Sequence, residues 1–303
     1  AGCGDSTTLT SGQTTATTGA SASTTLAPST TTTVSAPPSG QSPRGGGTQS
    51  ADASSVETQY LDVAYADASE SQKLDIYLPN TGSGPYPVIV AIHGGAFLMG
   101  DKADGQLTPM LAGLDRGYAV VSINYRYVTQ AIVAGVKPPV QWPLHDAARA
   151  LQFVRSKAKE WNIDKARIGA SGGSAGACSS LWLAFHDDMA DPQSSDPVAR
   201  ESTRLWCAAV IGAQTTLDPQ QMKEWTPNSK YGGHAFGLGA FPQFLAGRDQ
   251  ILPWIAEYSP YALVSAGDPP VYLIYSAPPA LGQEQRDPTH TANFGVNLQE
   301  HCT

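Results

Sequence analysis

Residues 170–177 read Ala-Ser-Gly-Gly-Ser-Ala-Gly-Ala, and the predicted fold is built outward from them. They follow a short apolar run and precede a helix-like stretch at 178–186. Gly172 to Gly176 match Gly-x-Ser-x-Gly, which presents a serine on a tight strand-to-helix turn. Such a turn gives the serine a positive φ and crowds its flanks, so the residues two positions away must be small. Ser174 is therefore the candidate nucleophile, and the alternative is a glycine-rich turn that happens to contain serine.

A second glycine turn lies upstream, where His-Gly-Gly at 93–95 follows the apolar run 87–93. Glycines at the end of a strand let backbone N–H groups turn toward one point. The amides of Gly94 and Gly95, with that of Ala175, would form an oxyanion hole for acyl transfer. Because parallel strands end at one edge of a sheet, the two glycine turns are expected to meet. The side chain of His93 is predicted to hydrogen-bond this loop rather than to act as the general base.

The chain from Tyr60 onward alternates strand and helix patterns. Near-continuous apolar runs at 87–93 and 118–124 are typical of central parallel strands that are covered on both faces. Alternating apolar residues at 60–65 and 73–78 predict paired edge strands. Further strands are predicted at 167–169, 205–213 and 270–276, and helices at 106–115, from Pro143 onward, at 178–186 and at 291–301. The sequence therefore predicts an α/β fold with a doubly wound, mostly parallel sheet and helices on both faces.

Two segments depart from this rhythm. Residues 1–55 are dominated by Thr, Ser, Ala, Gly and Pro, contain no aromatic residue and carry three charged side chains. Such a segment buries too little apolar area to offset its ordering entropy, so a disordered tether is predicted before a folded domain at 56–303. Residues 215–264 are rich in aromatic residues, Pro and Gly, and are predicted to form a cap-like insertion near the site. A plain pair of surface helices is the alternative.

Composition excludes several classes of function. The net charge of −8 argues against nucleic-acid binding, because nothing would offset phosphate repulsion. No 18-residue apolar run could span a membrane. The four cysteines form no Cys-x-x-Cys pair, and no dinucleotide, P-loop or His-Glu-x-x-His motif occurs, so no cofactor and no metal are expected. Cys178 and Cys207 are expected to be buried thiols, with a disulfide between them left open.

The first three residues, Ala1-Gly2-Cys3, resemble the end of a bacterial lipoprotein signal. By that resemblance Cys3 would carry lipid, and the Thr/Ser-rich stretch would tether the folded domain to the cell envelope of an exported protein. Contact with a membrane would occur only through this lipid. A free cysteine in a flexible tail is the alternative.

The two glycine turns, with the stretch at 72–78, resemble the α/β-hydrolase fold. Within it they are similar to carboxylesterases of the hormone-sensitive-lipase-like and feruloyl-esterase-like groups, over residues 57–303. Ala96 stands where these proteins often have a third glycine, and its amide survives that change. The resemblance implies a triad in the order Ser, acid, His. It also implies a further strand and a catalytic histidine beyond Thr303, so the chain is interpreted as a fragment.

Asp287 is the predicted acid, because it follows the strand at 270–276 and resembles the Asp-Pro acid of these esterases. Asp218 is the second candidate, and helix capping is the alternative role for Asp287. His290 is the sole candidate base within the chain. Its closeness to Asp287 makes simultaneous pairing with that carboxylate and with Ser174 look awkward, which favours a histidine beyond the chain.

The resemblance implies a serine hydrolase of carboxylic esters. Its substrate would be a small short-acyl ester or a carbohydrate esterified with acetyl or feruloyl groups. Two other hypotheses stay open at the level of sequence. One is a non-catalytic relative that keeps the fold for binding, which a missing histidine would permit. The other is a peptidase of the same fold, because nothing in the sequence separates amide from ester substrates.

Overall fold

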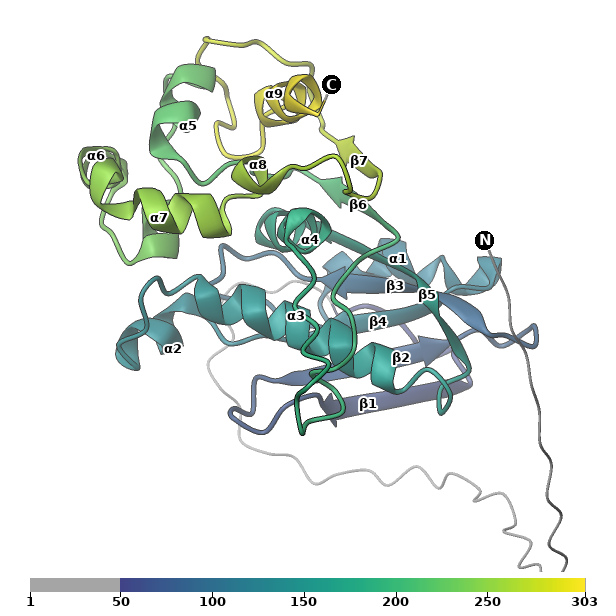
Figure 1. Cartoon of the computed structure of the whole chain (residues 1–303). Helices are drawn as coiled ribbons and strands as arrows, with labels where there is room; N and C mark the ends of the chain where they lie inside the picture. The colour runs from purple at the N-terminus through teal and green to yellow at the C-terminus, as the bar shows by residue number, and fades with distance from the viewer. Residues whose placement is uncertain (1–49, 303) are drawn as a thin grey trace, which may run out of the picture. The chain divides into compact units, whose positions relative to one another are not determined.

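Seven strands form one sheet in the computed structural model, which describes residues 50–302 (Figure 1). Their order is β1-β2-β4-β3-β5-β6-β7. The first two pairings, β1 with β2 and β2 with β4, are antiparallel, and the other pairings are parallel. The predicted mostly parallel sheet is therefore confirmed, and the two strands predicted to pair at its edge are the antiparallel pair β1 and β2. The strands are β1 (Thr58–Ala64), β2 (Lys73–Leu78), β3 (Tyr86–Ile92), β4 (Ala119–Ile123), β5 (Ile163–Gly173), β6 (Cys207–Ile211) and β7 (Val271–Ile274).

Helices connect the parallel strands. The long helices α3 and α4 were located by the sequence pattern, as was the final helix α9. The helical elements of the described residues are η1 (Gly105–Leu107), α1 (Thr108–Leu111), η2 (Leu114–Arg116), α2 (Val128–Val133), α3 (Gln141–Ser156), α4 (Ala175–Phe185), α5 (Pro219–Trp225), η3 (Gly233–Phe236), α6 (Phe241–Ala246), α7 (Arg248–Tyr258), α8 (Pro260–Leu263) and α9 (Asn293–His301).

The crossover at 106–115 is not the single helix that was predicted. It is divided into η1, α1 and η2. Pro109 fits the start of α1 but lacks the N–H that a continuous helix would need there. Gly113 sits where a Cβ would come within 2.9 Å of the Ile89 side chain, so the turn packs directly on β3. Close packing of short turns thus replaces a regular helix on this face.

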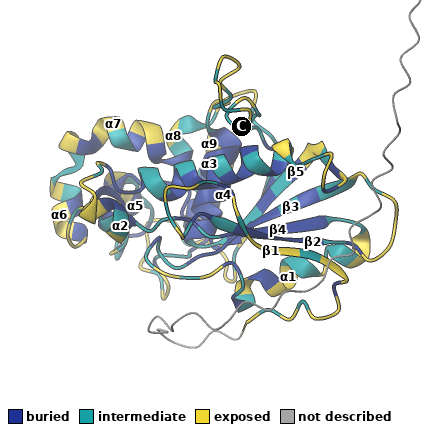
Figure 2. Ribbon diagram, turned by 90° about the horizontal axis from the view of Figure 1, so that it is seen from below, coloured by how far each residue is buried: buried dark blue, intermediate teal, exposed yellow. Residues whose placement is uncertain are grey.

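Both faces of the sheet are covered. Because successive strand residues point to opposite sides, one strand contributes side chains to both cores. On β4, Val121 and Ile123 belong to the large core under α3 and α4, whereas Val120 belongs to a smaller core under η1 and α1. The buried strands run between these layers (Figure 2). Helix α4 is buried along its whole length between the sheet and the segments that follow. This packing on both sides fixes the position of Ser174, the residue immediately before α4.

Residues 215–264 contain the helices α5 to α8 and the short turn η3, and the four helices lie together beyond the carboxyl end of the sheet (Figure 1). Phe236, Phe241 and Phe244 are buried against one another. These aromatic side chains therefore build the interior of the insertion rather than an open apolar wall. The segment is tied to the rest of the domain by Trp182, whose indole N–H donates to the carbonyl of Glu257 at 3.0 Å.

Two sequence-based predictions concern residues outside the described range. They are the lipid on Cys3 and the part of the predicted tether, residues 1–55, that precedes residue 50. Residues 50–55, which the tether prediction also included, are instead attached to the domain, because Ser50 pairs with Asp104 and the N–H of Ala51 donates to the carbonyl of Ala103 at 2.9 Å. Among residues 50–302, no helix is long and apolar enough to cross a bilayer. Cys178 is a buried thiol and Cys207 a half-buried one, and neither forms a disulfide.

Candidate active site

Ser174 occupies the strained turn that its flanking glycines predict. It lies between β5 and α4 with φ 53° and ψ −118°. A Cβ on Gly172 would come within 2.3 Å of the Ile92 carbonyl oxygen, and one on Gly176 within 1.9 Å of the same atom. Neither position can accept a side chain, so both glycines are required by the packing of the turn against β3. The surrounding sheet holds Ser174 in this strained conformation, in which its hydroxyl faces His290.

The hydroxyl of Ser174 is hydrogen-bonded to a histidine. His290 Nε2 lies 2.9 Å from Ser174 Oγ, and His290 Nδ1 lies 2.8 Å from Asp287 Oδ2. The three side chains thus form a continuous Ser–His–Asp relay, although 116 residues separate the serine from the histidine. Asp287 was named from the sequence as the acid, and the structure brings it into this relay.

The expectation that His290 would pair only awkwardly with both partners is wrong. Residues 287–290 form a tight turn in which Asp287 Oδ1 accepts the backbone N–H groups of Thr289 at 3.1 Å and His290 at 3.2 Å. This Asx turn leaves Oδ2 facing the imidazole Nδ1. The opposite ring nitrogen then points away from the turn toward Ser174. Adjacency in one loop therefore assists the pairing, and the Asp-x-x-His spacing was the signal in the sequence.

The turn that carries Asp287 and His290 packs against two residues that follow β6. Gly212 has a positive φ, and a Cβ there would lie 3.3 Å from His290 Cβ and 3.4 Å from its Cδ2. The glycine therefore leaves room for the imidazole ring. The buried Gln214 donates through Nε2 to the carbonyl of Thr289 at 2.7 Å. Neither residue belongs to a recognisable motif, and sequence reasoning missed both.

Asn293 joins the segment before Asp287 to the end of α5 through its side chain. Its buried side chain donates to the carbonyls of Trp225 at 2.8 Å and Ala280 at 3.0 Å, and it accepts the N–H of Ala280 at 2.7 Å. Asn228 adds a reciprocal pair with the backbone of Gln285, at 2.8 and 3.0 Å. The segment that bears Asp287 and His290 is thus hydrogen-bonded to the residues at and after the end of α5.

Replacing Asn293 by alanine is expected to lower the free energy of unfolding by about 2–4 kcal/mol, because several buried backbone groups lose their partner. Urea unfolding followed by tryptophan fluorescence measures the change. The matched control is Asn80→Ala, whose side chain makes a similar reciprocal pair with Ser55 and Glu57 at an exposed position. Equal losses of unfolding free energy in the two variants would contradict the proposed contribution of the buried Asn293 side chain to stability.

The first glycine turn lies against Ser174, as expected from the shared sheet edge. A Cβ on Gly94 would lie 3.4 Å from Ser174 Cβ and 2.7 Å from the carbonyl oxygen of Gly173. One prediction for this turn fails, because the N–H of Gly94 donates to Gln106 Oε1 at 2.9 Å and is not available to a substrate. A long side chain twelve residues downstream is not detectable by motif. Among the described residues, the amides of Gly95 and Ala175 have no protein acceptor.

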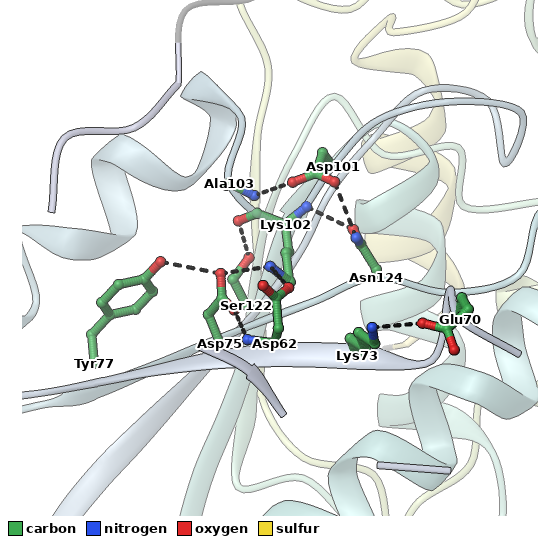
Figure 3. A network of polar contacts seen from close by, with 10 residues as sticks. All are labelled: Asp62, Glu70, Lys73, Asp75, Tyr77, Asp101, Lys102, Ala103, Ser122 and Asn124. Carbon is green, nitrogen blue, oxygen red and sulfur yellow. Dashed lines mark hydrogen bonds and ion pairs between the residues drawn. The ribbon is translucent and has the colours of Figure 1, made fainter. Parts of the chain in front are cut away.

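The loop after β3 is anchored to the antiparallel edge of the sheet (Figure 3). The buried Lys102 forms ion pairs with Asp75 and Asp62, each at 2.9 Å. The backbone N–H of Lys102 also donates to Asn124 Oδ1 at 2.7 Å, and Asn124 Nδ2 donates to Asp101 at 3.1 Å. A buried ammonium paired with a buried carboxylate is costly to separate, so the loop has a fixed attachment.

The charge state of the dyad follows from its contacts. Partial burial raises the pKa of Asp287, but the hydrogen bond and charge of His290 and the two turn amides outweigh it, so the pKa lies below its ordinary value. The carboxylate is therefore ionised at neutral pH and can accept the Nδ1 proton of His290. Burial lowers the pKa of His93, so that ring is neutral at pH 7.

Asp218, the second candidate acid, has a structural role. It caps α5 by accepting the N–H of Gln220, and both of its oxygens pair with Arg248 at 2.7 Å. This arrangement leaves it no part in the relay. Within the described residues no group of three or more His, Cys, Asp or Glu side chains is placed to hold a metal ion.

Curated proteins resemble this chain over about half of its length. It is 32% identical over 154 residues to the probable carboxylic ester hydrolase LipM of Mycobacterium tuberculosis, covering 48% of this chain and 32% of the relative. It is 30% identical over 158 residues to the phenmedipham hydrolase of Pseudarthrobacter oxydans, covering 52% and 29%. The chain therefore spans less than a third of the length of these curated relatives.

Solved structures share the fold at lower identity. A truncated carbohydrate esterase from gut microbiota superposes with a TM-score of 0.61 and 22% identity, over 84% of this chain and 86% of that one. The acetyl ester-xyloside bifunctional hydrolase of Caldicellulosiruptor lactoaceticus gives 0.55 and 24%, over 76% and 72%. These neighbours bear out the α/β-hydrolase fold that the two glycine turns predict. The BD-FAE family model matches residues 74–279, more than half of the chain, and the protein therefore belongs to the BD-FAE family.

Proposed function

We propose that this chain is a serine hydrolase of carboxylic esters that works through an acyl-enzyme on Ser174. The observation that carries the proposal is the relay from Ser174 Oγ to His290 Nε2 at 2.9 Å and from His290 Nδ1 to Asp287 at 2.8 Å. A hydroxyl bonded to an imidazole that is itself oriented by a carboxylate is the arrangement that activates serine for acyl transfer.

The reaction follows from this geometry. Ser174 Oγ attacks the ester carbonyl while His290 Nε2 takes the hydroxyl proton, and Asp287 stabilises the imidazolium that forms. The negative oxygen of the tetrahedral intermediate is bound by the amides of Gly95 and Ala175, at the start of α4, where the helix dipole also favours negative charge. His290 then protonates the departing alcohol, and water repeats the sequence to release the acid.

The alternatives from the sequence are affected unequally by this geometry. The non-catalytic reading rested on an absent base, and the contact of His290 with Ser174 removes that reason. A peptidase of the same fold would use the same relay. Homologues named as carboxylic ester hydrolases support the ester over the amide.

For the substrate, we propose a short-acyl ester, or an acetyl or feruloyl ester of a carbohydrate. The side chains of Asp287 and His290 are 60% and 38% exposed, so the side of the site that meets the leaving alcohol is open to a bulky group. The names of two structural neighbours, a carbohydrate esterase and an acetyl ester-xyloside hydrolase, agree with this class.

The proposed activity is tested with the full chain, p-nitrophenyl acetate and a fluorophosphonate probe. We expect turnover of the ester and a covalent adduct on the peptide that contains Ser174, identified by mass spectrometry. Parallel assays with p-nitroacetanilide and with acetylated xylan separate amide, simple ester and carbohydrate ester. A folded chain that neither turns over an ester nor forms the adduct would overturn the proposal.

For location, we propose an exported protein held at the bacterial cell envelope by lipid on Cys3. The support is the sequence Ala1-Gly2-Cys3 followed by a long Thr/Ser-rich spacer. Mass spectrometry of the N-terminal peptide from membrane and soluble fractions tests this. An unmodified Cys3 in the soluble fraction contradicts it.

A further inference from the structure

The backbone beside Ser174 is held at three of its polar groups. The carbonyl of His93 accepts the Tyr125 hydroxyl at 2.9 Å, and the N–H of Gly94 donates to Gln106 Oε1 at 2.9 Å. These two bonds fix the plane of the peptide between residues 93 and 94. The next carbonyl, that of Gly94, lies 2.7 Å from His93 Nδ1, which must carry the proton because a carbonyl oxygen only accepts. Both peptide planes that precede the Gly95 side of the turn are therefore fixed.

The direction of the Gly95 amide follows from these contacts. In a trans peptide the carbonyl of one residue and the N–H of the next point in opposite directions. The Gly94 carbonyl is turned toward His93, so the Gly95 N–H is turned away from it. Gly95 itself has φ 111°, a conformation that side-chain residues rarely adopt and that supplies no rigidity of its own. The orientation of this amide therefore depends on the bonds to its neighbours.

Gln106 is itself oriented by a carboxylate. Its Nε2 donates to Asp104 Oδ2 at 3.0 Å, and its backbone N–H donates to Asp104 Oδ1 at 2.9 Å. A carboxylate accepts only, so the amide nitrogen of Gln106 must face Asp104 and its oxygen must face Gly94. Asp104 is buried, and its own N–H donates to the carbonyl of Asp101 in the anchored part of the loop. The side-chain amide is thus fixed at both ends.

We propose that Gln106 is a positioning residue for the transition state of this reaction. By holding the Gly94 N–H it keeps that amide out of the reacting centre and keeps the Gly95 amide aimed at the oxyanion beside Ser174. Gln106 touches no reacting atom itself. This inference rests on the proposed ester hydrolysis and assigns to it a residue that no motif contains.

The test compares Gln106→Met with wild type, because methionine has a similar length and lacks the amide. Loss of a well-aimed oxyanion donor costs about 10²- to 10³-fold in kcat, and a misaimed donor is expected to cost about 10- to 100-fold, with KM changed by less than about twofold. The rate of fluorophosphonate labelling at Ser174 is expected to fall in parallel, since the phosphonyl oxygen occupies the oxyanion position.

The matched control is Gln130→Met. Gln130 Oε1 likewise accepts a backbone N–H, that of Tyr127 at 2.7 Å, at the start of α2. Both variants lose a bond from a glutamine to the backbone, so similar shifts in the midpoint of thermal unfolding are expected. Only Gln106→Met is expected to lose kcat. Asp104→Asn provides a second variant, in which the amide of Gln106 is released without deletion, and a smaller loss of kcat is expected.

The outcomes separate this inference from the proposed function. If the wild-type chain turns over the ester and both Gln106→Met and Asp104→Asn keep the wild-type kcat, the positioning role is overturned and the proposed hydrolase activity stands. A parallel loss of kcat in the Gln130→Met control overturns it too, because the effect would then follow general stability. A wild-type chain without turnover or labelling overturns the proposed function and this inference with it.

Discussion

Ser174→Ala is expected to reduce kcat/KM for p-nitrophenyl acetate by roughly 10⁵- to 10⁶-fold and to abolish labelling by a fluorophosphonate. The variant lacks the oxygen that forms the acyl-enzyme, and the other side-chain hydrogen bond of His290 goes to the acid Asp287. The amides of Gly95 and Ala175 remain, so weak catalysis over water is expected to persist. Stopped assays at high protein concentration measure the residual rate.

The control for this change is Ser171→Ala, three residues earlier on β5. Its hydroxyl donates to the carbonyl of Ala209 at 2.7 Å and makes no hydrogen bond to the relay. Activity in this variant is expected to stay within about a few-fold of wild type, as for a substitution outside the reacting centre. Turnover that survives Ser174→Ala at the wild-type level would place the nucleophile elsewhere and remove the proposed mechanism.

Local sterics explain why Ser174 could be predicted from the sequence. Gly172 and Gly176 are needed because the Ile92 carbonyl leaves no space for a Cβ, and that requirement is visible as two glycines at fixed spacing. The central strands were equally visible, since burial on both faces demands continuous apolar runs. Features that depend on one turn or one strand therefore appear in the sequence itself.

Features assembled from distant segments could not be predicted in the same way. The role of His290 depends on a turn that closes on Ser174 from 116 residues away, and on Gly212 and Gln214 beneath it. The engagement of the Gly94 amide depends on Gln106, whose long side chain returns to the loop from η1. In each case the deciding contact is a side chain against a backbone group of another segment, for which the sequence carries no periodic signal.

The prediction with the second large effect concerns that base. His290→Ala is expected to lower kcat/KM for p-nitrophenyl acetate by roughly 10⁴- to 10⁶-fold, because the hydroxyl of Ser174 loses its proton acceptor. The side chain is 38% exposed, so its removal leaves a solvent-accessible gap rather than a buried cavity, and little change in the free energy of unfolding is expected. Steady-state kinetics and urea unfolding measure the two quantities separately.

Chemical rescue distinguishes a base from a structural residue. Free imidazole can enter the gap left in His290→Ala, and it is expected to restore part of the turnover in a concentration-dependent way. The matched control is His186→Ala, whose ring contacts Glu257 at 3.2 Å, and it is expected to keep wild-type kinetics. Full activity in His290→Ala would contradict the role of His290 as the base and favour the histidine beyond Thr303 that the resemblance implies. A loss of activity that imidazole partly reverses identifies His290 as the base. If the base were another histidine, removal of the His290 ring would leave its function unchanged.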